Sequence, residues 1–578
     1  FVSRKLLSTF HNNSITMERR QDFAESSGVG SSSISSPDGS GECDACHPFQ
    51  SRKKRQATLD AYLVQSVCQQ DPEGTFEALQ QGANPNAQAD EGMNVIHFAS
   101  LYGNANLLHA LIEHNADTNL LCSGSGLSPL HFAVLMGHAA SVRILLEEGF
   151  ADPNIASSLS ARTPLQIAVT VPRPESVQIA ETLIAFGADV MVLEDDDLNL
   201  LHVCGNDPLM VKLLVDSGVS PTARSKTDLT PLHLACLNGN LTKVKALVEL
   251  GVGVNDDCST DDGIRSPLHC ACDGGHIDVV RYLVEEQDAD PFCKDRNGKL
   301  PIHQACKMKH KRIVDFFLNA CEIFPDTPDS NGNTCLHWVC RKVHNVDTSV
   351  VYNLAGSLLH RMPSIINIAN LEGQTALHHA SFWSANLCQI LVECWDADLT
   401  KKDRTGQTPL LLAARHADVG DSTASYLAGM TVELHPSRVN DTDNMGWTAL
   451  HWASFRYDER LIRILLEVGA DANVSSVYGR RPLHLVGRFQ IPTGLYQRDL
   501  HLDSVLDKSI VFQSRTVTNE SVQALLEAGA DSIASDHRGD LPFFLAATTG
   551  SVNDTYQMMR AATGKGLFNN LASQMADE

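Results

Sequence analysis

The sequence predicts an α-solenoid, a row of stacked helix-turn-helix repeats with projecting β-turn loops. Three observations predict this fold: a short pattern recurs thirteen times, a second amphipathic segment follows it, and a turn containing Gly leads to the next copy. One unit of this kind cannot bury its own apolar faces, so its stability depends on the neighbours stacked against it.

The recurring pattern is Thr or Ser, followed by Pro, Leu, His, any residue and Ala. Its cleanest copies begin at Ser128, Thr230 and Ser266. Residues in the Leu slot of successive copies are mostly 31 to 36 positions apart. They are Ile96, Leu130, Leu165, Leu201, Leu232, Leu268, Ile302, Leu336, Leu377, Leu410, Leu450, Leu483 and Phe543.

Each part of the repeat has a physical reason. The Thr or Ser hydroxyl caps the first helix, and Pro suits its first turn because the missing amide hydrogen has no partner there. A second helix with paired leucines is expected, for example over residues 142–148 or 461–468. It ends at Gly-Ala-Asp, as at residues 187–189, since Gly accepts a left-handed backbone. A turn such as residues 403–406 then leads to the next unit.

This pattern and period resemble the ankyrin repeat, whose signature is Thr-Pro-Leu-His-x-Ala. The resemblance covers about residues 57–562. It implies a solenoid that binds other proteins along the face formed by the first helices and the projecting turns.

The chain divides into regions of different composition. Residues 1–56 form a Ser/Gly-rich leader that we expect to be disordered, and residues 57–92 read as a degenerate N-terminal capping unit. Thirteen ankyrin-type repeats are expected over 93–562, followed by a short polar tail at 563–578. An insertion at about 490–517 interrupts one repeat, and extra residues near 344–352 lengthen another. Such insertions map to loops, where partner specificity can lie.

The overall charge excludes some classes of function. The net charge is −24, which argues against a dedicated nucleic-acid-binding protein because acidic surfaces repel phosphate. No apolar run approaches the roughly 18 to 20 residues that would insert into a membrane. The 16 cysteines read as small, reduced core residues of a cytoplasmic or nuclear protein. The basic run at residues 52–55 is either a nuclear-import signal or a solvated linker.

Histidine and cysteine patterns do not predict a metal or cofactor site. The family resemblance implies that the motif histidines are buried and bridge helix and turn by hydrogen bonds. Ten histidines occupy this slot: His97, His131, His202, His233, His269, His303, His337, His378, His451 and His484. Residues 43–47 match the haem-attachment string Cys-x-x-Cys-His, but without an enclosing domain a chance match is favoured. We expect no catalytic residues, no cofactor and no metal.

The predicted binding surface is formed by the two residues that precede the Gly-His of the mid-repeat loop in each unit. The family resemblance implies that these two residues are exposed. Arg and aromatic residues are favoured interface anchors, and a groove for an acidic, partly hydrophobic peptide is the resulting hypothesis. The alternative is that long Lys and Arg chains merely solvate the helix ends. The candidate residues are Leu101, Tyr102, Leu135, Met136, Lys307, Met308, Arg341, Lys342, Phe382, Trp383, Phe455, Arg456, Arg488 and Phe489.

These features predict a non-enzymatic scaffold or adaptor that binds protein segments reversibly. The alternative is the targeting region of a larger enzyme, such as a kinase, acyltransferase, ADP-ribosyltransferase or ubiquitin-ligase subunit. No kinase, nucleophile-elbow or dinucleotide-binding pattern is present in the sequence.

Overall fold

The computed structural model describes residues 47–89, 92–260, 263–343, 347–416, 422–486, 520–548 and 552–564. Successive helix pairs stack on one another, which confirms the predicted helical-repeat solenoid. Two compact units are distinguished by their contacts. Unit 1 comprises Phe1–Cys236, Asn240–Gly253 and Cys258–Asp261, and unit 2 comprises Leu237–Gly239, Val254–Asp257 and Asp262–Glu578.

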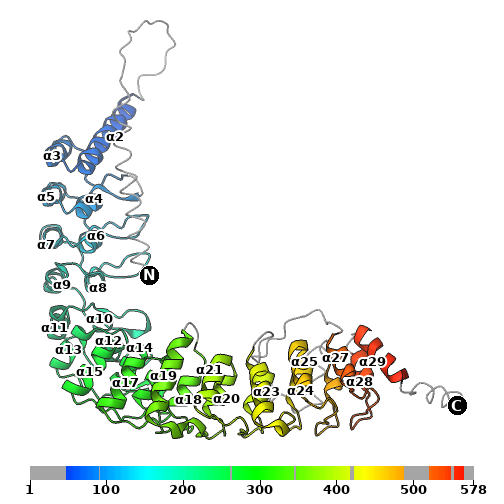
Figure 1. Ribbon diagram of the computed structural model, residues 1–578. Helices are drawn as coiled ribbons and strands as arrows, with labels where there is room; N and C mark the ends of the chain where they lie inside the picture. The colour runs from blue at the N-terminus through cyan, green and yellow to red at the C-terminus, as the bar shows by residue number, and fades with distance from the viewer. Residues whose placement is uncertain are drawn as a thin grey trace, which may run out of the picture. The chain divides into compact units, whose positions relative to one another are not determined.

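Unit 1 contains two parallel columns of helices. Figure 1 shows α3, α5, α7, α9 and α11 in one column beside α2, α4, α6, α8 and α10 in the other, and packing contacts join each helix to the next in its column. The elements are α2 (His47–Cys68), α3 (Pro72–Gln80), α4 (Val95–Tyr102), α5 (Ala105–Glu113), α6 (Pro129–Met136), α7 (Ala139–Glu147), α8 (Pro164–Thr170), α9 (Ser176–Ala185), η2 (Asp195–Asp197), α10 (Leu200–Val203), α11 (Pro208–Asp216), α12 (Pro231–Leu237), α13 (Leu241–Glu249) and β1 (Cys258–Thr260).

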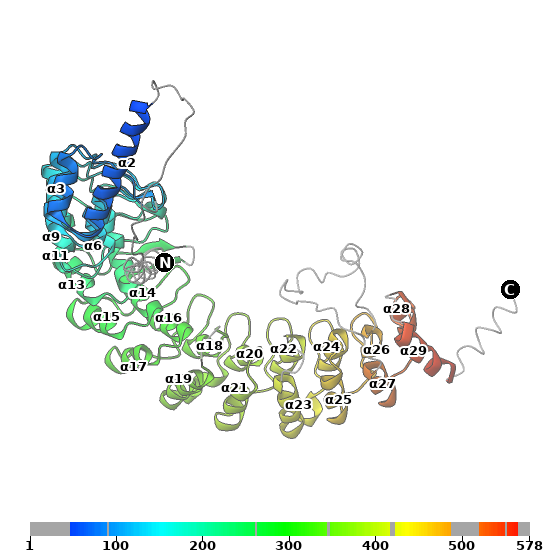
Figure 2. The ribbon, with the colours of Figure 1, turned by 90° about the horizontal axis from the view of Figure 1, so that it is seen from above.

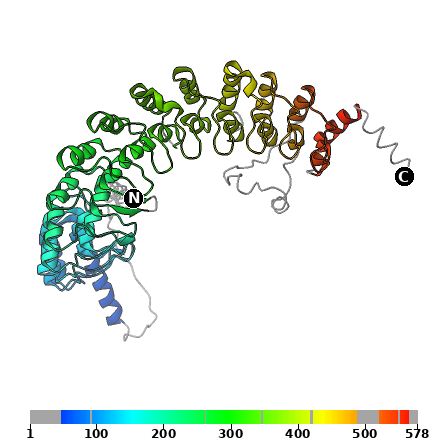
Figure 3. The same ribbon diagram turned by 90° about the horizontal axis from the view of Figure 1, so that it is seen from below.

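Unit 2 repeats the same arrangement. In Figures 2 and 3 the first helices of its repeats, among them α16, α18, α20, α22 and α24, form one row and the second helices form another. The elements are β2 (Gly263–Arg265), α14 (Pro267–Gly274), α15 (Ile277–Arg281), η3 (Tyr282–Glu286), α16 (Pro301–Met308), α17 (Lys311–Ala320), α18 (Cys335–Cys340), α19 (Thr348–Arg361), η4 (Pro363–Asn367), α20 (Ala376–Ser381), α21 (Ala385–Gln389), η5 (Ile390–Cys394), α22 (Pro409–His416), α23 (Ser422–Leu434), η6 (Pro436–Arg438), α24 (Ala449–Arg456), α25 (Glu459–Glu467), α26 (Pro482–Leu485), α27 (Glu520–Glu527), α28 (Pro542–Thr548) and α29 (Val552–Gly564).

The first helices begin as the sequence predicts. In α6, the Ser128 hydroxyl accepts a hydrogen bond from the His131 amide, and Pro129 occupies the first turn. The motif leucines are buried: Leu232 in α12 and Leu268 in α14 are both the second residue of their helix and at most 1% exposed. At the other end of the repeat, Gly187 and Gly469 have φ of +88° and +91°, the left-handed conformation that favours Gly.

Asparagine side chains join the loops that follow the second helices. In unit 1 the Asn119 Oδ1 accepts a hydrogen bond of 2.8 Å from the Asp152 amide of the next repeat. In unit 2 Asn367 makes the same 2.8 Å contact with the Asp398 amide. The amide would otherwise lack a partner, so each repeat fixes the loop of its neighbour.

Backbone hydrogen bonds join the projecting turns themselves. The Ser158 amide donates to the Gly126 carbonyl at 3.0 Å in unit 1, and the Arg404 amide donates to the Glu372 carbonyl at 2.8 Å in unit 2. These bonds use no side chain. The register of the turns is therefore independent of which residues occupy them.

Two expectations about the chain's divisions need correction. Residues 47–56, expected to be disordered, form the start of α2, because Arg and Lys are good helix formers and Gln56 Nε2 donates to Asp60 Oδ1 and to the Gly82 carbonyl. The extra residues near 344–352 are not all loop, since α19 begins at Thr348 and is 14 residues long. The insertion at 490–517 lies outside the described residues, as do residues 1–46 and 565–578.

Candidate functional site

The motif histidines connect neighbouring repeats. In His451 the Nδ1 atom accepts a 3.1 Å hydrogen bond from the Thr448 amide, so the proton lies on Nε2, which donates to the Arg480 carbonyl of the next repeat at 3.0 Å. His131 makes the same bridge in unit 1, with Nε2 at 2.9 Å from the Arg162 carbonyl. These contacts match the structural role that the family resemblance implied for the motif histidines.

Burial lowers the pKa of several of these histidines, that of His451 to about 4. At His303 burial acts in the same direction, but the interaction with Cys335 outweighs it and the pKa is raised. The pKa of His379, which follows the motif residue His378, is lowered to about 3 by burial and by the nearby His337. Two histidines depart from the pattern, because the Nε2 atoms of His233 and His484 have no hydrogen-bond partner within the part of the chain that the structure describes. Protonation would break the bridge, so a catalytic or pH-sensing role does not follow from this slot.

The carbonyl groups at the ends of the first helices receive side-chain donors from a neighbouring repeat. In unit 1, His138 Nε2 donates to the Leu101 carbonyl at 3.1 Å. In unit 2, His310 Nε2 donates to the Asp273 carbonyl at 3.3 Å. Helix C-termini leave carbonyls without partners, so these contacts meet a requirement of every repeat.

Unit 2 meets the same requirement at α18 with unusual residues. Lys309 Nζ donates to the carbonyls of Trp338 and Arg341 at 2.7 and 3.1 Å, and the Trp383 indole donates to the Cys340 carbonyl at 2.8 Å. Lys309 is 4% exposed, and burial lowers its pKa to about 8. The sequence predicted Lys309 as a cation that reinforces the binding face, and its burial corrects that prediction. It stands where other repeats have a Gly with positive φ, such as Gly275, and has a φ of +65° itself.

Those predicted binding residues that the structure describes lie at or just beyond the C-terminal ends of the first helices. Four are in unit 1: Leu101 and Tyr102 end α4, and Leu135 and Met136 end α6. The others belong to unit 2. Lys307 and Met308 end α16, Arg341 and Lys342 follow α18, Phe382 and Trp383 follow α20, Phe455 and Arg456 end α24, and Arg488 and Phe489 lie outside the described residues.

These residues differ in how free they are to contact a partner. Arg341, Lys342 and Met136 are exposed, and the rest of the described set is half-buried. Trp383 is held by its bond to Cys340, and Arg456 Nη1 donates to the Arg415 carbonyl at 2.6 Å. These two side chains stabilise the stacking of repeats, so replacing them would perturb the fold as well as the surface.

Cations and aromatic rings gather at the end of α18. Lys299 Nζ lies 4.5 Å and Arg341 Cζ lies 5.4 Å from the centre of the Trp338 ring, within the range of a cation–π contact. The Trp338 indole donates to Asp329 Oδ2 at 3.2 Å. Lys299 belongs to the turn before α16, which is not among the positions that the repeat pattern singled out.

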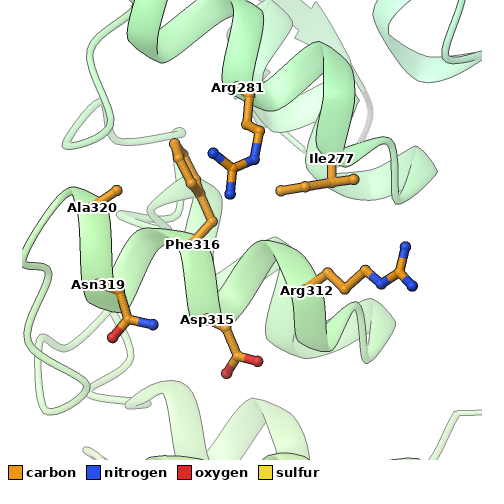
Figure 4. A pocket seen from close by; sticks show the side chains of 7 residues that line it. All are labelled: Ile277, Arg281, Arg312, Asp315, Phe316, Asn319 and Ala320. Carbon is orange, nitrogen blue, oxygen red and sulfur yellow. The ribbon is translucent and has the colours of Figure 1, made fainter.

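A pocket of about 440 Å³ lies on the other row of helices, between α15 and α17 (Figure 4). Arg281 occupies its centre, with its guanidinium 4.9 Å from the Phe316 ring. Arg281 also pairs with Glu285 at 3.0 Å, and Asp315 pairs with Lys311 at 2.6 Å. The charged groups of this pocket are therefore largely matched by neighbours.

Neither a metal-binding cluster nor a membrane-spanning helix occurs in the described residues. Across ranges 47–89 to 552–564, no three His, Cys, Asp or Glu side chains are placed to hold a metal ion together. Over the same ranges, no helix has both the length and the apolar character needed to cross a bilayer.

Comparison with known proteins identifies the repeat. The family described as Ankyrin repeats (3 copies) matches residues 63–157 and 200–295, and the family described as Ankyrin repeat matches residues 445–476.

Relatives share this region and differ in the rest of their chains. Neurogenic locus notch homolog protein 1 from Xenopus tropicalis is 29% identical over 203 residues, which is 32% of this chain and 8% of that protein. E3 ubiquitin-protein ligase KEG from Arabidopsis thaliana is 26% identical over 202 residues, 33% of this chain and 12% of that protein. The chain thus spans about a tenth of the length of these two relatives.

A third relative is matched along almost all of its length. The ankyrin repeat protein FPV223 of Fowlpox virus (strain NVSL) is 31% identical over 144 residues, which cover 25% of this chain and 98% of that protein. The chain therefore belongs to the ankyrin-repeat protein family.

Proposed function

We propose that this protein is a non-enzymatic scaffold or adaptor that binds segments of other proteins along the face presented by its first helices and turns. The observation that carries the proposal is the separation of structural and surface roles. Buried histidines, asparagine side chains and turn amides join the repeats. The residues at the ends of the first helices differ in charge and shape from repeat to repeat. Stacking contacts that recur between repeats, combined with helix ends that differ, suit selective binding.

The partner segment in this proposal is acidic and partly hydrophobic. Arg341 and Lys342 are exposed just beyond α18. Phe382, just beyond α20, and Phe455, near the end of α24, are half-buried, and α22 lies between these two first helices. The Phe382 ring lies 4.7 Å from the His416 ring, and the Phe455 ring lies 5.6 Å from the Trp447 ring, so the aromatic groups are held in place. Preorganised aromatic side chains lose little entropy on binding.

A test of this function replaces apolar groups of the face and leaves its charges unchanged. We expect Met308→Ser, Phe382→Ala and Phe455→Ala together to remove a specific set of proteins from affinity purification analysed by mass spectrometry. The control variant replaces Lys212, Lys401 and Arg460, three exposed cations away from these helix ends, with Ala.

The captured proteins are then purified and titrated directly. Loss of direct binding in the apolar variant, with retention in the control and unchanged thermal unfolding of both, supports the proposal. Equal binding by all three proteins contradicts it.

A second candidate is the targeting region of a larger enzyme. The name of the KEG relative favours it, since that protein is an E3 ubiquitin-protein ligase of which this chain matches 12%. Sequencing the full-length transcript distinguishes the two: a catalytic domain in the same reading frame supports the enzyme, and its absence supports the adaptor.

A further inference from the structure

Four cations lie around α16 and just beyond the end of α18. They are Lys299, Lys307, Arg341 and Lys342, and we refer to them as the cation cluster. Within the described residues none of them forms an ion pair. Four cations gathered without an ion pair are a local exception in a chain of net charge −24.

The carboxylates nearest to the cluster already have their hydrogen bonds made. Asp329 accepts from the amides of Asn331 and Asn333 through Oδ1, and from the Asn333 side chain and the Trp338 indole through Oδ2. Its lone pairs are therefore used by neutral donors.

Two further carboxylates near the cluster are engaged in the same way. Asp295 Oδ1 accepts from the amides of Asn297 and Lys299 at 2.9 and 2.7 Å. Asp273 pairs with Arg265 at 3.5 Å and also accepts a hydrogen bond from Gln304. These acids stabilise the turns and α14. Asp295 and Asp329 attract Lys299 at longer range, but no carboxylate among the described residues forms an ion pair with the cluster.

Contacts with Trp338 and Lys309 hold the cation cluster in place. Lys299 and Arg341 both lie against the Trp338 ring, which is 5% exposed and fixed by its bond to Asp329. The Arg341 carbonyl accepts from the buried Lys309 ammonium, which fixes the backbone from which Arg341 and Lys342 project. Like charges held close together repel one another, so an added anion relieves a repulsion that the fold itself maintains.

We infer that the cation cluster is the anchor for carboxylate groups of an acidic peptide segment, with an aromatic or aliphatic side chain of the same segment lying towards Phe382. This inference rests on the proposed function and assigns the part of the face that recognises charge. The acidic remainder of the chain does not cancel the attraction, because screening limits charge effects to about 8–10 Å in physiological salt.

The probe for this site is a fluorescein-labelled peptide of repeated Glu-Glu-Phe triplets, titrated by fluorescence anisotropy with the full chain. We expect the wild type to bind it more tightly than a peptide of Lys-Lys-Phe triplets and than a double-stranded DNA oligonucleotide. Replacing Lys299, Lys307 and Arg341 with Ala together is expected to weaken binding about tenfold, as three partly screened contacts imply.

Two control variants distinguish the loss of the cluster's charge from a change in net charge or in folding. The control replaces Lys212, Lys401 and Arg460 with Ala, which changes the net charge equally and should leave the affinity unchanged. A second control, Lys299→Arg, Lys307→Arg and Arg341→Lys, keeps the charges and should retain at least half of the wild-type affinity. Rising ionic strength should weaken wild-type binding and the charge-retaining control, and should affect the Ala variant less.

Several outcomes would overturn the inference. They are equal binding of acidic and basic peptides, equal binding of DNA, and an unchanged affinity in the Ala variant of the cluster. In each case loss of a purified partner by the Met308, Phe382 and Phe455 variant would still support the proposed function, so the two proposals fail separately.

Discussion

At the end of α10 in unit 1 and at the end of α18 in unit 2, backbone carbonyls accept hydrogen bonds from the ammonium group of a buried lysine. Both first helices stop early, and the next residues, Cys204 and Arg341, have extended backbone with ψ of 152° and 137°. In unit 1, Lys243 Nζ donates to the carbonyls of His202 and Cys204 at 3.2 and 2.9 Å. In unit 2, Lys309 does the same for Trp338 and Arg341.

The residues beyond the helix end distinguish the two regions. After α10 the chain continues with Cys204 and Gly205, and after α18 it continues with Arg341 and Lys342. A short first helix is thus a structural feature in unit 1, while in unit 2 it also presents two cations. The comparison teaches that a buried lysine donor occurs at both helix ends, while the charge of the residues beyond the helix differs between them.

The largest effect is expected for a buried cation that does have a carboxylate partner. Arg480 Nε lies 3.2 Å from Asp536 Oδ2, and both side chains are at most 6% exposed. Arg480→Met leaves a buried carboxylate without its charge partner and should lower the free energy of unfolding by about 3–5 kcal/mol. Denaturant unfolding followed by circular dichroism measures this, and a loss under about 1 kcal/mol would show that the pair contributes little.

A smaller loss of folding stability is expected when the pH is lowered. The pKa of His451 falls from 6.5 to about 4 on burial, so the unfolded chain binds the proton more readily. The stability from this group is complete above pH 6.5 and is lost as pH falls to 4, about 3 kcal/mol in all. His451→Gln should flatten the dependence of unfolding free energy on pH over this range, and an unchanged slope would contradict the assignment.

The two buried lysines provide the direct test of the comparison. Lys243→Met and Lys309→Met each keep the packing of the side-chain stem and remove the donor from two carbonyls. We expect each to lower the free energy of unfolding by about 2 kcal/mol, with Lys212→Met as an exposed control near zero. If only one of the two were destabilising, the ends of α10 and α18 would not be equivalent.

The smallest effect is expected at the asparagine contacts, which are alike in both units. Asn119→Ala and Asn367→Ala each remove one hydrogen bond to a loop amide, and Asn367→Ala also removes the longer bond of 3.4 Å from its Nδ2 to the Asp396 carbonyl. Each should cost about 1 kcal/mol, because water can replace the lost acceptor in part. Hydrogen exchange of the Asp152 and Asp398 amides measures this locally, and unchanged protection would contradict it.

Sequence reasoning predicted what all repeats share. The positions of first and second helices depend on local chemistry that recurs along the chain, as at Ser128. The bridging role of the motif histidines was implied by the family resemblance and is seen at His451, among others. The same reasoning placed the candidate residues at one end of each first helix, since their spacing from the motif is constant.

The departures from the pattern could not be predicted, because they depend on contacts between repeats. Trp383 and Arg456 looked like surface anchors, but each donates to a carbonyl about forty residues earlier in the chain. Lys299 was overlooked because it belongs to a turn, although the turn brings it against Trp338. Lys309 carried a signal in the sequence, since it replaces the Gly found at this position in α4 and α14 repeats.

The most direct test of the central claim locates the bound peptide. The photo-crosslinking residue p-benzoylphenylalanine is placed at position 342, beyond α18, or at position 212, on the second helix α11. With the Glu-Glu-Phe peptide as probe, we predict cross-links from position 342 that excess unlabelled peptide removes, and none from position 212. Equal labelling from both positions, or labelling from position 212 alone, would contradict the claim that the first-helix face of unit 2 holds an acidic segment.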